Sequence, residues 1–371
     1  MDTLASVKFL RKQGLTDARC RLVLEQITLR PIAKRKFSSV ESMFFERTLL
    51  EQATDERLAA FKAARFGDAK TAVDICCGLA GDLIALAKHA NRAECFGIDA
   101  SGVAVHLARA NCPQATIIQQ LAEEHALPAD AWVHIDPDRR VEGRRTTTLE
   151  FFSPDAEYLS KLIQQQKNVA IKLAPVTRLP PDWSCHQRQW LGSRQECKQQ
   201  MVWCGATSAD NDRPNQGAET LRTATAIDNV GSVIFDWHET EPGRCEVAAD
   251  IGDYLYEPHA TVIAGRMIDS LANRYGLTRL AADVQYLTGA EVDFPALTRF
   301  RVLERCRVDD KEVRERLRFY DAGHLEIKKR GVEHQLIDRF AKLKLSGDQS
   351  LVLVLTRLRD KYIALICKRE I

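Results

Sequence analysis

Short apolar runs that alternate with helix-length segments constrain the fold of this chain most strongly. They begin after Gly67, and their β-branched residues are typical of strands. Strands separated by helices form βαβ units around a parallel sheet, whose ligands lie at the carboxyl ends of the strands. The sequence therefore predicts an α/β fold with functional residues just after its strands. The predicted strands are Thr71–Ile75, Ala93–Ile98, Ala115–Gln119, Trp132–Ile135 and Val169–Leu173, and helices are expected from near Gly81, Ser101 and Pro154.

Two other regions flank this pattern. Residues 1–66 have apolar side chains at spacings of three and four, which predicts an amino-terminal helical region. Gln199–Cys204 and Ala224–Ile227 are candidate last strands of the sheet, on either side of the Pro/Gly/Asn-rich loop Asn211–Gly217. After about Tyr254, strands and helices mix, which indicates a small α+β region. Its predicted helices are His259–Tyr275 and Val332–Leu343, and its predicted strands are Val302–Val308, Leu325–Lys329 and Leu351–Leu355.

The composition indicates a globular protein of the reducing cytoplasm. Apolar residues make up 45% of the 371 residues and charged residues 28%, and no run reaches the length of a membrane span. The eleven cysteines include no C-x-x-C pair, so free thiols are expected. Cys185, Cys197, Cys204 and His186 fit no tetrahedral zinc spacing, and we expect no metal site.

The charge is uneven along the chain. Residues 296–371 hold 19 basic and 12 acidic side chains, a local charge of +7, whereas the whole chain carries +2. A basic region suits an anionic partner such as RNA, although such a surface can also serve solubility alone.

A glycine-rich turn carries the first chemical signal. It runs from Asp74 to Asp82 as DICCGLAGD and includes Cys76, between the first predicted strand and its helix. Gly78 and Gly81 let the backbone turn tightly and approach a ligand, and the start of the helix offers free N–H groups. The G-x-G-x-x-G spacing of dinucleotide-binding folds is absent. The two flanking carboxylates repel a pyrophosphate and attract the sulfonium and ammonium groups of S-adenosylmethionine.

Later strand ends add candidate ligands. Asp99 ends the second predicted strand, where dinucleotides and S-adenosylmethionine alike have their ribose hydroxyls bound. Gln120 follows the third strand, where it can accept a hydrogen bond from the adenine amine or be an ordinary surface glutamine. Lys172 lies near the end of the fifth strand and is a candidate substrate contact.

The fourth strand is followed by Asp136-Pro137-Asp138-Arg139-Arg140. An Asp-Pro pair stands where amino-methylating enzymes place an acidic or amide residue and a proline, so that oxygens accept from the target amine. We assign Asp136 to orienting the acceptor, Pro137 to shaping the loop and Asp138 to accepting a proton; the alternative is an ordinary Asp-Pro turn. The basic side chains of this stretch suit phosphate or form a salt-bridged loop, and they are Arg139, Arg140, Arg144 and Arg145.

These two motifs resemble those of bacterial class I S-adenosylmethionine-dependent methyltransferases that carry a THUMP-like carboxy-terminal domain. Four further stretches match in the same order, namely Leu50–Thr54, Ile171–Pro175, Tyr254–Pro258 and Leu325–Val332. The resemblance implies a Rossmann-like catalytic domain at 67–240, a ferredoxin-like insert at 254–295 and a THUMP-like domain at 296–371, after the helical region. It also implies S-adenosylmethionine as cofactor and RNA (tRNA or rRNA) as substrate, by analogy with tRNA-modifying enzymes.

Two departures from the family pattern leave other functions open. Ala80 replaces a common glycine, and no aromatic residue closely follows Asp136-Pro137 to stack on a base, so oxygen and carbon acceptors remain open. The alternatives are a catalytically silent RNA-binding module, a methyltransferase acting on protein or a small molecule, and a nicotinamide-dependent oxidoreductase. In the tail, Lys328, Lys329 and Arg330 are expected to present phosphate-binding charge on a turn.

Overall fold

The computed structural model describes residues 3–67, 69–89, 94–141, 144–183, 185–205, 220–240, 243–333, 339–340 and 343–370. The chain divides into two compact units. The first contains residues 1–194, 198–221 and 227–233, and the second contains residues 195–197, 222–226 and 234–371. The predicted loop Asn211–Gly217 lies outside the described residues, as does most of the predicted helix Val332–Leu343. The division into four domains stays a prediction.

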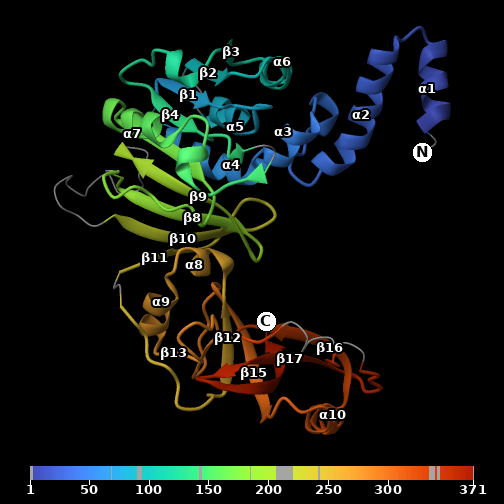
Figure 1. Cartoon of the computed structure of the whole chain (residues 1–371), viewed down its shortest axis with the longest axis vertical. Coiled ribbons are helices and arrows are strands. Elements are labelled where there is room, and N and C mark those ends of the chain that lie inside the picture. The colour runs from blue at the N-terminus through green and yellow to red at the C-terminus, as the bar shows by residue number, and fades with distance from the viewer. Residues whose placement is uncertain are drawn as a thin grey trace. The chain divides into compact units, whose positions relative to one another are not determined.

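A nine-stranded sheet in the order β11-β10-β8-β9-β7-β4-β1-β2-β3 forms the α/β part of the chain (Figure 1). Neighbouring strands from β3 to β7 are parallel, whereas β9 runs antiparallel to β7. The strand order reverses between β1 and β4, which places the ligand crevice at the carboxyl ends of these two strands. The strands are β1 (Thr71–Ile75), β2 (Glu94–Asp99), β3 (Thr116–Gln119), β4 (Trp132–Ile135), β7 (Asn168–Leu173), β8 (Gln187–Ser193), β9 (Glu196–Cys204), β10 (Leu221–Ile227) and β11 (Val233–His238).

The predicted strands of this sheet are confirmed, but β8 and β11 were not predicted. The sequence did not predict β8 because two of its buried residues are glutamines, which interrupt the apolar pattern of a strand. Gln187 and Gln189 are fully buried, and their side-chain oxygens accept hydrogen bonds from Arg65 at 2.8 Å and from Trp203 Nε1 at 3.0 Å. A short hairpin of β5 (Arg140–Val141) and β6 (Arg144–Arg145) forms a separate two-stranded sheet.

Helices cover both faces of this sheet. Ala72 belongs to a core cluster with side chains of α5 (Gly81–His89) and α6 (Gly102–Asn111), while Val73 belongs to another with side chains of α7 (Ala156–Gln165). Because successive strand residues point to opposite faces, α5 and α6 pack on one side of the sheet and α7 on the other. The α/β architecture with a Rossmann-like sheet is therefore as the sequence predicts.

The amino-terminal region is helical and partly belongs to the same core. α1 (Thr3–Lys12) and α2 (Asp17–Ala33) lie side by side, and α3 (Arg47–Gln52) and α4 (Glu56–Ala63) follow (Figure 1). Ala59 and Ala63 of α4 are buried in one cluster with Leu83 and Leu86 of α5. The last helices before the sheet are thus part of its packing. Short 3-10 helices occupy Val40–Ser42, Ala64–Phe66, Ala122–Glu124 and Leu149–Phe151.

The second unit contains a seven-stranded sheet in the order β13-β14-β12-β15-β18-β17-β16. Its strands are β12 (Tyr254–Pro258), β13 (Thr278–Arg279), β14 (Leu287–Gly289), β15 (Leu297–Cys306), β16 (Ala322–Lys329), β17 (Gln349–Leu358) and β18 (Lys361–Glu370). β16 and β17 are parallel, and the other pairs are antiparallel. The residues predicted as a separate insert contribute three strands to the same sheet as the tail.

The described residues of this unit include the helices α8 (Ala260–Ala264), α9 (Ile268–Tyr275) and α10 (Asp310–Phe319). The single helix predicted at His259–Tyr275 is wrong, because the chain breaks it at Gly265 and at Arg266, whose φ is 54°. The prediction also missed α10, since only Val313 and Leu317 on one of its faces are buried. β18 was likewise not predicted.

The backbones of Gly323, near the start of β16, and Gly347 lie so close together that Gly323 should not tolerate a larger residue. A Cβ at Gly323 would lie 1.7 Å from the carbonyl oxygen of Gly347, which cannot move without the backbone. Gly323→Ala is therefore expected to lower the free energy of unfolding by about 3 kcal/mol, measured by urea denaturation. Gly276→Ala is the control, because its φ of 65° is strained but nothing lies within 4 Å of the added Cβ, and it should cost about 1 kcal/mol. Equal losses in the two variants would contradict the steric argument.

Candidate active site

The turn between β1 and α5 leaves one side of its backbone open. Three residues of the turn have a left-handed backbone conformation, with φ values of 59° at Cys76, 55° at Gly78 and 74° at Ala80. A Cβ at Gly78 would meet only Leu49 Cδ2, at 3.9 Å, which leaves room for a ligand against this backbone. The Gly78 N–H donates to Asp99 Oδ2 at 2.9 Å. Asp99 thus holds the turn and the end of β2 together.

Other residues of this turn have packing roles that the structure makes visible. A Cβ at Gly81 would lie 3.4 Å from the Thr54 carbonyl oxygen, so glycine lets α5 approach the connection between α3 and α4. Ala80 is fully buried in the left-handed region, which costs an L-residue about 1 kcal/mol. Burial raises the pKa of the Cys76 and Cys77 thiols well above the usual value, which opposes thiolate chemistry at the turn.

A buried polar network lies beneath the turn and joins four elements of the first unit. His134 Nδ1 on β4 is 2.7 Å from Asp74 Oδ1 on β1, and Lys62 Nζ on α4 is 3.1 Å from His134 Nε2. Lys62 Nζ is also 2.6 Å from Asp82 Oδ1 on α5, and the Thr54 hydroxyl donates to Asp82 Oδ2 at 2.7 Å. All five residues are buried. The two acids of the glycine-rich turn are therefore tied to partners inside the protein.

Electrostatics separate the two acids. Burial opposes ionisation of Asp82, but Lys62, His134 and Lys172 together outweigh it and lower the pKa of this carboxyl. Burial raises the pKa of Asp74, against the opposing effect of His134. Asp74 Oδ2 is buried and has no hydrogen-bond partner among the described residues. An unpaired carboxylate oxygen beside an open glycine turn fits a cationic ligand group such as the ammonium of S-adenosylmethionine.

Sequence reasoning missed Lys62, His134 and Thr54 as members of this network. A signal for Lys62 was present, because Leu58, Ala59, Lys62 and Ala63 form the buried stripe of α4. A lysine in an apolar stripe needs a buried anionic partner. The sequence could not show which carboxylate that partner is.

A second ion pair lies at the carboxyl ends of β4 and β7. Lys172 Nζ donates to Asp136 Oδ2, and the lysine side chain is 10% exposed while that of Asp136 is 25% exposed. Although burial opposes it, the charge of Asp136 raises the pKa of Lys172, so the lysine is a cation at neutral pH. The sequence predicted both residues at this crevice, and the structure brings them into contact.

The loop after Asp136 is tied to α3. Gln52 Nε2 donates to Asp138 Oδ1 at 3.0 Å, and Arg140 lies 3.7 Å from Glu51. The backbones of Asp138 and Ser153 exchange two hydrogen bonds, of 2.8 and 2.9 Å, and Phe151 nearby in sequence is 59% exposed. The stretch Leu50–Thr54, which carries part of the family resemblance, therefore supports both the glycine turn and this loop.

The remaining predicted residues of the first unit follow β3 and β4. The Gln120 amide already has partners, because it donates to the Glu124 carbonyl at 3.1 Å and its oxygen lies 2.9 Å from His125 Nδ1. Arg139 is half-buried. In the backbone register of the small hairpin, Arg140 is opposite Arg145 and Val141 is opposite Arg144.

The chain is similar to known proteins in two comparisons. Residues 297–369 match the family model described as THUMP domain-like. Two curated relatives are described as uncharacterized S-adenosylmethionine-dependent methyltransferases of Mycobacterium tuberculosis, strains CDC 1551 / Oshkosh and ATCC 25618 / H37Rv. Each is 29% identical to this chain over 330 residues, which cover 86% of this chain and 86% of the relative.

The chain is an S-adenosylmethionine-dependent methyltransferase, and residues 297–369 form its THUMP-like domain. The crystal structure of a candidate methyltransferase from Porphyromonas gingivalis W83 has the same fold over 100% of this chain and 98% of that one, with a TM-score of 0.74 and 17% identity. None of the described helices of the methyltransferase is long and apolar enough to span a membrane. Its described residues also include no group of three His, Cys, Asp or Glu side chains placed to hold a metal ion.

The predicted basic residues of the tail are less available than the sequence indicated. Lys328 and Lys329 lie in β16 rather than on a turn, so that part of the prediction is wrong. Lys328 Nζ is 2.6 Å from Glu257, and Arg330 is 3.0 Å from the same carboxylate. By contrast Arg301 and Lys368 are exposed, and neither has an ion-pair partner among the described residues.

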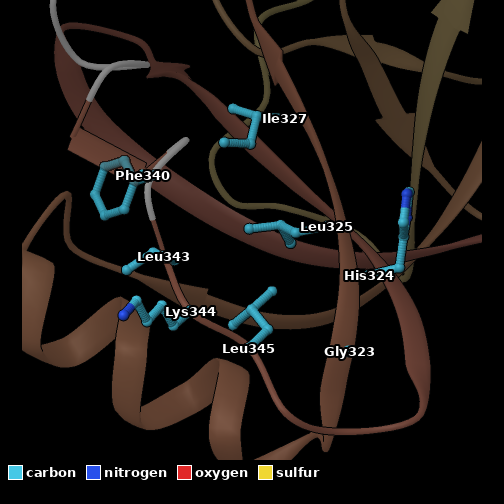
Figure 2. Close-up of a pocket in the computed structure, with 8 residues that line it drawn as sticks. All are labelled: Gly323, His324, Leu325, Ile327, Phe340, Leu343, Lys344 and Leu345. Atoms are coloured by element: carbon cyan, nitrogen blue, oxygen red, sulfur yellow. The ribbon is translucent and has the colours of Figure 1, made fainter.

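A cavity of about 780 Å³ also lies in the second unit (Figure 2). Its described lining is largely apolar, with Leu325 and Ile327 of β16 beside Phe340, Leu343 and Leu345. His324 and Lys344 are exposed at this cavity. The lining carries no carboxylate among the described residues, unlike the turn of the first unit.

The buried pair of the methyltransferase predicts a pH-dependent stability. Asp82→Asn is expected to lower the free energy of unfolding by about 3 kcal/mol near neutral pH, because Lys62 loses its buried counter-ion. Since the pKa of Asp82 is lowered in the folded protein, its contribution is present above the usual aspartate pKa and is lost as pH falls. The difference in the free energy of unfolding between Asp82→Asn and wild type should therefore become smaller below about pH 4, as measured by urea denaturation.

Asp17→Asn is the matched control for this measurement. It removes an exposed pair with Arg11, whose side chains are 2.7 Å apart, and should have little effect at either pH. A constant difference for Asp82→Asn from neutral to acid pH would show that its carboxylate is not the source of the stability.

Proposed function

We propose that this methyltransferase modifies RNA, either tRNA or rRNA, in the cytoplasm. The observation that carries the proposal is the position of the open Gly78 turn and the Asp136–Lys172 pair at the carboxyl ends of adjacent strands β1, β4 and β7. This is where a parallel sheet with this order binds its ligands. The THUMP-like domain and its basic charge support RNA as the acceptor.

We assign the cofactor to the turn and the ends of β2 and β3. Gly78 allows the close approach, Asp99 binds the ribose, and Gln120 contacts the adenine after exchanging its present partners. Asp74 Oδ2 receives the ammonium group. Asp82, Cys76 and Gly81 support the turn from beneath. S-adenosylmethionine, when bound, supplies an electrophilic methyl group.

The acceptor would be held by Asp136. Lys172 occupies its Oδ2, and Oδ1 has no hydrogen-bond partner among the described residues, so it is free to accept from the group to be methylated. Orientation of the acceptor is the main requirement of an in-line displacement. The buried Pro137 shapes the loop, and Asp138 accepts the released proton in this scheme. Phosphates of the substrate would contact Arg139, Arg140, Arg144 and Arg145, and the exposed ring of Phe151 is available to stack on a base.

A second candidate function is binding of RNA without turnover. It is favoured by Asp138 and Arg140, which are engaged with Gln52 and Glu51 instead of standing free at the loop. The two functions differ in whether a methyl group is transferred.

Transfer of labelled methyl from S-adenosylmethionine to fractions of cells that lack the gene tests the proposal. We expect label in RNA, and a loss of about 100-fold in Asp136→Asn, because the acceptor is no longer oriented. Asp130→Asn, which changes an exposed aspartate outside the crevice, is the control and should keep full activity. Label in protein or in small molecules would show that the substrate is not RNA. The absence of label from every fraction would favour RNA binding without turnover.

The charges of the second unit predict where RNA binds. Arg301→Ala combined with Lys368→Ala is expected to weaken binding of bulk tRNA by roughly tenfold and to reduce the salt slope by about 2, because two phosphate contacts are lost. Filter binding at several salt concentrations measures both. Lys328→Ala should have a smaller effect, since Glu257 neutralises that lysine. A larger loss of affinity in Lys328→Ala than in the double variant would indicate that RNA binds at the tail residues that the sequence predicted.

A further inference from the structure

Lys62 is not used by the methyl-transfer scheme, although its placement is costly. Its side chain is 2% exposed on the apolar stripe of α4, with Nζ 2.6 Å from Asp82 Oδ1 and 3.1 Å from His134 Nε2. Removing an ammonium from water is unfavourable, and a buried ion pair is often no more stable than apolar residues of similar volume. Stability alone is therefore a poor explanation for a lysine at this position.

The hydrogen bonds around Lys62 have one consistent direction. Burial lowers the pKa of Lys62, but the Asp82 carboxylate at 2.6 Å opposes this effect and favours the ammonium form. An ammonium group only donates, so His134 Nε2 accepts from Lys62. The proton of the imidazole then lies on Nδ1, which donates to Asp74 Oδ1 at 2.7 Å. Asp74 accepts this bond as a carboxylate, and its Oδ2 remains without a partner among the described residues.

We infer that Lys62 is a positioning residue for the cofactor, which acts through His134 to hold Asp74 as a carboxylate with one oxygen left for the ligand's ammonium group. This inference rests on the proposed role of Asp74. The charged groups nearest to the network are Asp82, which Lys62 and Thr54 hold, and Asp136 and Lys172, which pair with each other. Because Lys172 is occupied by Asp136, it does not substitute for Lys62. The amino-terminal helices thereby contribute to the cofactor site from beneath.

The test is the affinity of the full-length protein for S-adenosylhomocysteine, measured by calorimetry. Lys62→Met removes the donor to His134 Nε2 and the counter-ion of Asp82, so binding should become about tenfold weaker than in wild type. His134→Gln interrupts the same relay and should weaken binding to a similar extent. The double variant Lys62→Met/His134→Gln should bind about as weakly as either single variant, because both substitutions act on one network.

Lys36→Met is the matched control, because Lys36 also anchors the amino-terminal region. Its Nζ donates to the carbonyl oxygens of Leu50, Glu51 and Ala53 at 2.8, 2.9 and 2.6 Å, without contacting a carboxylate of the turn in these bonds. It should lower the thermal midpoint and leave the affinity for S-adenosylhomocysteine unchanged. If Lys62→Met does not fold, the weaker binding expected of His134→Gln alone tests the same relay.

The outcomes separate this inference from the proposed function. A wild-type protein that binds no S-adenosylhomocysteine would remove the cofactor site itself. Wild-type binding together with an undiminished affinity in Lys62→Met or in His134→Gln would leave the methyltransferase intact and overturn the role of Lys62.

Discussion

The ion pair between Lys62 and Asp82 is the interaction on which the first unit depends, because it joins the amino-terminal helices to the glycine turn inside the protein. Asp82 lies in the first turn of α5, and its second oxygen accepts a hydrogen bond from Thr54 in the connection between α3 and α4. The same connection packs against Gly81. The turn is strained at Cys76 and Ala80, which are left-handed without being glycine, and it persists because its surroundings fix it from two sides.

Charge compensation also organises the crevice above this pair. The carboxylates of Asp82 and Asp136 each have a lysine partner, whereas Asp74 has only the imidazole of His134 and keeps one oxygen unpaired. In a site that excludes water, an unpaired carboxylate attracts a cation much more strongly than a surface acid does. Among the described residues of this network, Asp74 Oδ2 is therefore a buried carboxyl oxygen that is left for a ligand.

The second unit shows that the number of charges in a sequence differs from the charge available to a partner. Its basic excess is real, but Lys328 and Arg330 share the carboxylate of Glu257, and Arg369 lies 2.7 Å from Glu326. Cross-strand neighbours that are distant in sequence produce these pairs. Arg301 and Lys368 are opposite each other on β15 and β18, and they remain exposed on the same face of the sheet.

The sequence by itself determined the α/β class, the parallel strands of the first sheet and the two motifs at its carboxyl edge, because period, length and turn residues are local signals. It also placed Asp136 and Lys172 at one crevice, since the ends of parallel strands meet at one edge. Only the tertiary structure decided that Lys62 and His134 complete the network below the turn, that Gln187 and Gln189 lie inside a strand, and that the tail lysines are neutralised. Partners of buried polar groups come from distant parts of the chain, and no local pattern in the sequence specifies which ones will meet.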